Sequence, residues 1–287
     1  MRSGVCGRCF NQRGCRYRKT VIIDLQLNQG SAPWSLLSEA AIAAEETGYS
    51  TLWNLDHFSG TSFDSDSMLE CFTSLTAWAS VTTTMHVGTL VANVMNREAG
   101  LLANIVSSVQ HISGNRLRLG IGAGTAPKSP WNGEQVALGL PLLPTMAQRH
   151  ARLVDIVDTM KHLWSHDRHE KFHGFPRPDI VPPIIIGTNS EGLARIAGTH
   201  ADGVNTRFNH PERSQLLAIA REASGHRADF DCTVWSPFVP EYADPSHPFH
   251  QELVADGVTR LVLFHKSAPD VNAITSIAPY LSKSTSA

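Results

Sequence analysis

The feature that most constrains the fold is an eightfold alternation of β-rich runs and helical patterns along 287 residues. The first unit shows the form: the apolar run VIIDLQL (21–27) precedes a segment that begins at Pro33 and ends at Gly48, which is typical of a helix. Eight strands, each followed by a helix, predict an α/β fold, the (β/α)8 or TIM barrel, which commonly takes about 250 residues. A doubly wound open sheet is the competing arrangement, and it rarely keeps so even a count.

The other seven units repeat this order. Strands are expected at 50–55, 86–92, 117–125, 183–187, 203–208, 232–239 and 260–265. Helices are expected at 69–82, 98–112, 145–165, 190–199, 211–224, 248–256 and 270–282. No linker, repeat or low-complexity segment interrupts the series, so residues 21–287 are predicted to form one barrel domain.

The fourth strand, LRLGIGAGT (117–125), opens into glycines, as does a strand that feeds a dinucleotide-binding turn. The G-x-G-x-x-G spacing is not met. If the first two glycines begin the motif, its third falls at Thr125, and if the next pair begins it, the third falls at Pro127. The sequence therefore does not predict a Rossmann-type site.

Charge is distributed unevenly along the chain. Residues 1–20 hold six of the 24 Lys and Arg and none of the 26 Asp and Glu, so the rest has 18 basic against 26 acidic groups. An acidic body argues against nucleic-acid binding. No apolar run approaches the ~20 residues that a membrane span needs. Residues 1–20 also lack the apolar centre of a secretory signal, so a disordered basic leader is expected there.

Three of the five cysteines, Cys6, Cys9 and Cys15, lie in this leader. Cys6 and Cys9 could begin a metal-binding knuckle, but a zinc site needs a further ligand and no histidine precedes His57. The other two cysteines are far apart in the sequence and suggest no disulfide framework, which predicts a reducing, cytoplasmic location.

Polar residues at the carboxyl ends of barrel strands are the candidates for function. Such positions hold Gln26, Asn28, Asn54, Asp56, His57, Asn93, residues 122–125, residues 188–192, Asn205, Arg207, Glu241 and His265. Asp56 and His57 directly follow an apolar strand, and histidine is the commonest proton-transfer group near neutral pH. A histidine that only caps a loop is the alternative.

The fifth strand runs into GTNSEG (187–192) at the start of a helix. Free N–H groups and the helix dipole make such a turn an anion site, as in phosphate-binding barrels. The alternative is an ordinary Ser or Asn helix cap.

Four histidines, at 162, 166, 169 and 173, would share one face of a helix if the helix persisted that far. Histidines on adjacent turns can bind zinc. A solvated polar helix end is the alternative, and we expect no metal ligand in this chain.

Three segments resemble the bacterial luciferase-like monooxygenase superfamily, which includes flavin-dependent monooxygenases and oxidoreductases that use the deazaflavin coenzyme F420. They are GYSTLWNLDHF (48–58), VGTLVANVMNREAGLLANIVSSVQHISGNRLRLGIGAG (87–124) and PPIIIGTNSEGLARIAGTHADGVN (182–205), and QRHARLVDIVDTMKHLW (148–164) is similar to the helix between the last two. The resemblance implies a (β/α)8 barrel that binds reduced FMN or coenzyme F420 and acts on a small organic substrate.

The resemblance also implies roles for individual residues. His57 would donate a proton, and Leu90-Val91 falls where many members have a non-prolyl cis peptide. The glycines of the fourth strand would let the chain approach a flat ring. The implied cofactor-binding residues are Asp56, Leu90, Val91, Asn93, Ala123, Gly124, Thr188, Asn189, Ser190, Gly192 and Leu193. A homodimer and, for a flavin monooxygenase, a separate reductase would be the partners.

Two departures from the family pattern leave alternatives open. Some deazaflavin-dependent sugar-phosphate dehydrogenases carry a catalytic glutamate directly after the fourth-strand glycines, where this chain has Thr125. The segment from Ser165 to Val181 is also short, which suggests a reduced substrate lid. A barrel that binds the cofactor without turnover is therefore one alternative. A metal-dependent hydrolase on the same fold, which would rest on Asp56, His57 and the four histidines, is another.

Overall fold

The computed structural model describes residues 21–281, so the expected leader at residues 1–20 lies outside the described part of the chain. Eight parallel strands pair in chain order, and the last pairs with the first. The strands are β1 (Ile22–Leu27), β2 (Thr51–Asn54), β3 (His86–Asn93), β4 (Leu117–Gly122), β5 (Ile184–Gly187), β6 (Gly203–Arg207), β7 (Asp231–Pro237) and β8 (Arg260–His265). The predicted (β/α)8 barrel is confirmed.

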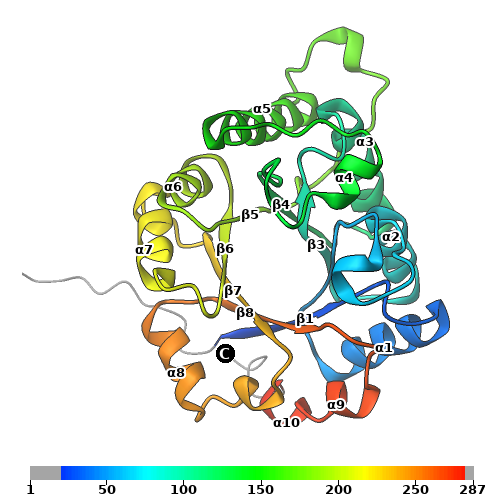
Figure 1. Cartoon of the computed structure of the whole chain (residues 1–287), viewed down its shortest axis with the longest axis vertical. Helices are drawn as coiled ribbons and strands as arrows, with labels where there is room; N and C mark the ends of the chain where they lie inside the picture. Colours follow the sequence, from blue (N-terminus) through cyan, green and yellow to red (C-terminus); the bar gives the residue numbers. More distant parts are fainter. Residues whose placement is uncertain (1–20, 282–287) are drawn as a thin grey trace, which may run out of the picture.

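Helices surround the strands (Figure 1). The longer ones are α1 (Trp34–Thr47), α2 (Cys71–Val81), α3 (Ala99–Ile112), α5 (Met146–Trp164), α6 (Glu191–His200), α7 (Arg213–Ala223) and α8 (Pro248–Ala255). The short ones are α4 (Gly133–Ala137), α9 (Val271–Thr275) and α10 (Ala278–Leu281), with 3₁₀ turns η1 (Gly60–Phe63), η2 (Glu170–Phe172) and η3 (Pro240–Ala243). Between residues 21 and 281, no helix is long and apolar enough to cross a membrane.

The local sequence explains these elements. β5 is an unbroken apolar run whose three isoleucines are fully buried, as expected of a parallel strand covered on both faces. α5 begins with a capping box, in which the N–H of Gln148 donates to the Thr145 hydroxyl and the Thr145 N–H donates to the Gln148 side chain. The main core lies between strands and helices, and a smaller cluster of Trp53, Leu90, Ile185 and Val262 packs together.

A network of buried ion pairs links the amino-terminal parts of four strands. Asp24 of β1 accepts two hydrogen bonds from Arg260 of β8, at 2.9 and 3.0 Å, and one from the Trp53 indole at 3.1 Å. Asp231 of β7 pairs with both Arg260 and Arg118 of β4. Polar groups at this end of a barrel serve stability, whereas the opposite end holds the functional site.

Candidate functional site

A pocket of about 950 Å³ opens at the carboxyl ends of the strands. It brings together nearly all residues that the resemblance selected, from β3 and from the loops after β2, β4 and β5. The lining includes Asp56, His57, Leu90, Val91, Asn93, Ala123, Gly124, Thr188, Asn189, Ser190 and Leu193. Gly192 is the exception, because it lies beside the pocket in the first turn of α6, where an added Cβ would be 3.2 Å from the His150 ring.

The floor of the pocket is an irregular stretch of β3. The pairing of β3 with β4 shifts between Thr89 and Ala92, and the Leu90-Val91 peptide is cis, as the resemblance predicted. Gln26, fully buried inside the barrel, donates a hydrogen bond of 2.8 Å to the Leu90 carbonyl. The indole of Trp235 donates to the other end of the same Gln26 amide. The floor is therefore held from beneath by side-chain hydrogen bonds.

The glycines of β4 make room for this floor. A Cβ on Gly120 would collide with the carbonyl oxygen of Thr89, and one on Gly122 would lie 2.6 Å from a Val91 methyl group. Gly124 has a positive φ of 79°. The neighbouring strand alone leaves no room for a Cβ at Gly120 or Gly122. Gly122 also lines the pocket, so the close approach of a ligand ring to these glycines stays a prediction.

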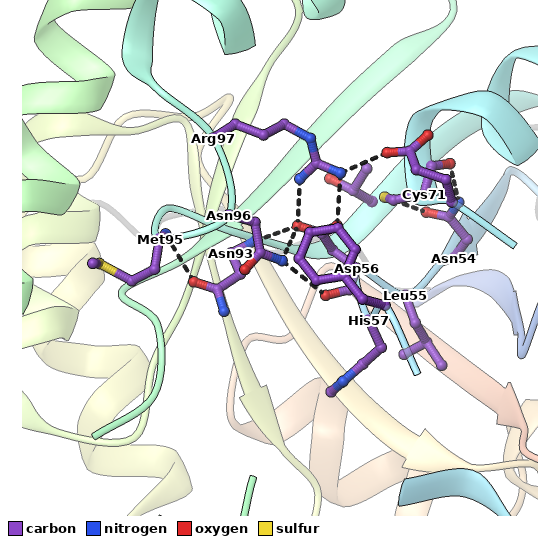
Figure 2. Close-up of polar contacts among 12 residues, drawn as sticks. Asn54, Leu55, Asp56, His57, Cys71, Asn93, Met95, Asn96 and Arg97 are labelled. Atoms are coloured by element: carbon purple, nitrogen blue, oxygen red, sulfur yellow. Dashed lines mark hydrogen bonds and ion pairs between the residues drawn. The ribbon is translucent and has the colours of Figure 1, made fainter. Parts of the chain in front are cut away.

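Asp56 organises the loop after β3 (Figure 2). Its carboxylate receives two hydrogen bonds from Arg97, at 2.8 and 2.9 Å, and one from the Asn93 N–H at 2.8 Å. Burial lowers the pKa of Arg97, but the hydrogen bonds with Asp56 outweigh it and raise that pKa above its usual value. A second carboxylate, Glu70, lies 2.6 Å from the same guanidinium. Asp56 therefore fixes the position of the Asn93 backbone in the pocket lining.

His57 points away from this network (Figure 2) and is paired with Glu134 of α4. The distance from its Nδ1 to the Glu134 carboxylate is 3.0 Å. The same carboxylate accepts the N–H groups of Phe58 at 2.7 Å and Ser59 at 3.1 Å. Burial raises the pKa of Glu134, but the bonds from His57 and the two N–H groups lower it below its usual value. Nδ1 is thus occupied, and Nε2 has no partner within residues 21–281.

The turn between β5 and α6 behaves as a helix cap and also borders the pocket. The Ser190 hydroxyl accepts the Leu193 N–H at 3.4 Å, and the Thr188 hydroxyl donates to the Ser190 carbonyl at 3.0 Å. The remaining N–H groups of the first turn have no intrahelical partner. The cationic side chains of Arg149 and Arg207 also line the pocket. This side therefore suits an anionic group.

Two buried polar atoms in the lining have no hydrogen-bond partner within the described residues. They are Oε1 of Gln135 and the hydroxyl of Thr206, on side chains that are each 1% exposed. Buried polar groups in proteins are nearly always satisfied, so these two are available to a polar ligand. Together with the cations on the β5–β6 side, they fit a ligand that carries a phosphate and hydrogen-bonding ring edges.

The segment expected to form a reduced lid does not contribute to the pocket. The chain between α5 and β5 projects beyond α5 (Figure 1), and none of residues 165–181 lines the pocket. The mouth is instead lined by the segment between β4 and α5, which supplies Trp131 and Glu134.

The histidine row does not share one helix face. α5 ends at Trp164, and Ser165 after it is extended, so only His162 of the four lies in this helix. His169 caps the separate turn η2. No group of three His, Cys, Asp or Glu side chains within residues 21–281 could hold a metal ion. The hydrolase alternative therefore has no support in the described structure.

Several pocket residues were not selected from the sequence. Glu134 and Trp131 come from the segment between β4 and α5, for which the sequence predicts no element, and the helix that holds Glu134 is only five residues long. Trp235 and Phe264 lie near the ends of β7 and β8, where the register of an inward-facing aromatic could have indicated them. Arg149 lies on the helix that the resemblance covers, one turn after its start.

A pocket lined by residues of β3 to β8 and by the loop after β2 places the chain among the (β/α)8 barrels with a functional site at the carboxyl face. A family model described as luciferase-like monooxygenase matches residues 20–248. The chain therefore belongs to the luciferase-like monooxygenase family.

Two curated relatives cover most of this chain. The 5,10-methylenetetrahydromethanopterin reductase of Methanolobus tindarius is 26% identical over 217 residues, which are 72% of this chain and 62% of that protein. The F420-dependent glucose-6-phosphate dehydrogenase of Nakamurella multipartita is 29% identical over 212 residues, 68% of this chain and 60% of that protein. This chain thus spans less than two thirds of the length of either relative.

A solved structure shares the fold over nearly the whole chain. It is an F420-dependent secondary alcohol dehydrogenase in complex with an F420–acetone adduct, with a TM-score of 0.74 and 18% identity. The match covers 92% of this chain and 99% of that one. At this identity the similarity shows the barrel fold.

Proposed function

We propose that this protein is a luciferase-like oxidoreductase that binds FMN or coenzyme F420 in the pocket and acts on a small organic substrate. The observation that carries the proposal is the division of the pocket. One side has Arg149, Arg207 and the unpaired Thr206 hydroxyl, and the floor is the cis Leu90-Val91 peptide. Across from these cations lie His57, which has one open ring nitrogen, and the unpaired amide oxygen of Gln135. Family membership supports the same function.

The residues divide into those that would hold the ring and those that would hold the phosphate. Leu90, Val91 and the Ala123-Gly124 turn are suited to the ring, because they form an apolar floor and edge. The Thr188–Leu193 turn, with Arg149 and Arg207, is suited to the phosphate. The bound cofactor would supply the hydride or oxygen chemistry, while the protein binds, orients and manages protons.

His57 is the residue that we assign to proton transfer. Its Nδ1 is bound to Glu134, so a proton can be exchanged with a ligand through Nε2. A carboxylate behind a histidine stabilises the imidazolium that forms when the ring accepts a proton. Thr125 cannot supply a carboxylate, but Glu134 places one beside His57. This argues against a barrel that binds the cofactor without turnover.

Cofactor binding is the direct test. Full-length protein is titrated separately with FMN and with coenzyme F420, and the fluorescence of the ring is followed. Micromolar binding of one and not the other is expected and identifies the cofactor. If neither binds, the proposed function is wrong. If a bound, reduced cofactor is oxidised by no acceptor, the alternative without turnover holds.

The variant His57→Ala tests the proton-transfer role. General acid–base catalysis contributes roughly 100-fold or more, so the rate of cofactor oxidation with substrate should fall by about that factor, with little change in cofactor affinity. His265, at the end of β8 and outside the pocket lining, provides the matched control. Unchanged turnover in His57→Ala would show that another group moves the proton.

The family resemblance supports three further proposals: a homodimer, a separate reductase if the cofactor is FMN, and a cytoplasmic location. Light scattering of purified protein measures the first. Dependence of turnover on an added flavin reductase measures the second. Two buried, unpaired cysteines, Cys71 and Cys232, are compatible with the third.

A further inference from the structure

The pocket has an aromatic wall that the cofactor-binding residues do not use. Phe63 packs edge-on against the His57 ring with centroids 5.0 Å apart, and against Phe264 at 6.2 Å. Phe264 in turn contacts Trp235 at 5.4 Å. All four rings line the pocket. Because β2 and β8 lie across the closed barrel from β6 and β4, most of this wall faces the cationic side.

The charges near the aromatic wall are neutralised in pairs. Lys266 binds Asp64 at 3.0 Å, and the His57 ring is backed by the Glu134 carboxylate. An anionic group placed against the wall would have to compete with Asp64 for Lys266, and it would approach the carboxylate that lies behind the imidazole. Removing a charge from water without a partner is costly, whereas an apolar group is favoured on the same surface.

Arg207 is a cation near the wall that has no carboxylate partner among the described residues, so it could reverse this conclusion. It pairs in register with Trp235, lines the pocket, and has no side-chain partner within residues 21–281. Its neighbours along β6, however, are Asn205 and the unpaired hydroxyl of Thr206, which belong to the polar side of the pocket. We therefore group Arg207 with the phosphate-binding residues, and the experiment below separates the two possibilities.

We infer that the aromatic wall binds an uncharged substrate with a compact ring or other apolar body and one oxygen atom within reach of Nε2 of His57. Phosphorylated and carboxylated substrates are excluded from this wall. The inference rests on the proposed function, because it assumes that the cofactor occupies the opposite side. It contrasts with the sugar phosphate named for the Nakamurella relative.

A matched pair of probes tests the inference. Benzyl alcohol and benzoate share a ring and differ in charge, and glucose 6-phosphate adds a phosphorylated probe. Binding to the full chain is followed by saturation-transfer NMR, with and without the cofactor. Benzyl alcohol should bind at least about tenfold more tightly than benzoate, because its ring gains aromatic contacts without the desolvation of a charge. Equal or tighter binding of benzoate or glucose 6-phosphate would overturn the inference.

Three variants locate the binding. Phe63→Ala should weaken benzyl alcohol binding by about tenfold, whereas Phe63→Leu should retain most of it. Phe175→Ala, at an exposed phenylalanine outside the pocket, should change nothing. Arg207→Gln should weaken the cofactor and leave benzyl alcohol unaffected. If Phe63→Ala binds benzyl alcohol as well as the unchanged protein does, the wall is not the site.

The outcomes separate this inference from the proposed function. If the cofactor titrates normally and benzoate is preferred, the function stands and the inference fails. If neither cofactor binds, the function fails, and the measurement without cofactor still decides whether the wall prefers the uncharged ring. If Arg207→Gln abolishes binding of benzoate or glucose 6-phosphate that the unchanged protein showed, Arg207 anchors an anionic substrate and the inference is wrong.

Discussion

The imidazole of His57 is oriented by one carboxylate. Glu134 is 8% exposed, and it accepts hydrogen bonds from the ring, from the N–H groups of Phe58 and Ser59, and from Gln135. The histidine side chain is 26% exposed, so the ring is open to the pocket while its Nδ1 is bound to Glu134. A buried carboxylate with this many donors stays ionised at neutral pH.

Replacing Glu134 by glutamine should lower turnover by roughly tenfold or more, because a neutral amide does not favour the protonated imidazole. The pH optimum of turnover should move to lower pH, and cofactor affinity should change little. A full pH–rate profile measures both effects. Glu98→Gln, at an exposed carboxylate paired with Arg152, is the control. If the rate falls at all pH values and the pH optimum does not change, Glu134 has a purely structural role.

The pKa of Glu134 also fixes the direction of its effect on stability. Because the folded-state value is lowered, the carboxylate contributes stability that is fully present above its ordinary value of 4.5. That contribution is lost as the pH falls through the lowered value. The bonds from the Glu134 carboxylate to the loop after β2 should therefore be kept at pH values above 4.5.

At this scale the sequence could predict only part of the site. The cis bond at Leu90-Val91 was predicted because the motif around it is local and resembles a known pattern. Glu134 was not, because its loop brings it to His57 through tertiary contacts that no spacing along the chain encodes. The sequence shows Thr125 where some relatives of the family carry a glutamate, but it did not reveal the carboxylate that α4 brings to His57.

At the scale of elements, β3 and β4 form a matched pair. The irregular stretch of β3 needs space that only glycine in β4 provides, so Gly120 and Gly122 serve the packing of the two strands. Helix ends were harder to predict than strands. The polar pattern after His162 continues without Gly or Pro to Gly174, yet α5 ends at Trp164. The last predicted helix is likewise two short ones, with Ser276 following α9.

Gly120→Ala should destabilise the protein by about 1–3 kcal/mol, since the added methyl group collides with the backbone of Thr89. Gly100→Ala is the matched control. Gly100 lies in α3 with nothing within 4 Å of the new Cβ, so this variant should be more stable by about 0.5–1 kcal/mol. Urea unfolding of both variants measures the difference. A Gly120→Ala protein as stable as Gly100→Ala would contradict the packing described for β3 and β4.

At the scale of the whole molecule, the two ends of the barrel have different tasks. The end beneath the pocket is closed by buried ion pairs that join β1, β4, β7 and β8, and the open end presents loops. This division allows stability and function to be changed separately. Eight regular strand–helix units made the barrel predictable from sequence, because each unit repeats the same pattern. The ion pairs were not predictable, since they join residues far apart in the chain.

Asp24→Asn should cost about 3–5 kcal/mol of folding free energy, because Arg260 would remain buried with one partner fewer. The folded fraction should bind the cofactor with unchanged affinity. Asp155→Asn, which alters an exposed pair with Arg152, should cost about 0–1 kcal/mol. Chemical denaturation and a cofactor titration on the same samples measure both quantities. A weakened cofactor site in Asp24→Asn would show that the two ends are coupled.

The bond between Glu134 and His57 connects the mouth of the pocket to the imidazole. The carboxylate that orients the imidazole is carried by the segment that lines the mouth, and the same carboxylate ties that segment to Phe58 and Ser59. Any movement that lifts α4 to admit a molecule releases the imidazole in the same step. The orientation of the imidazole therefore depends on the position of the same segment that lines the mouth of the pocket.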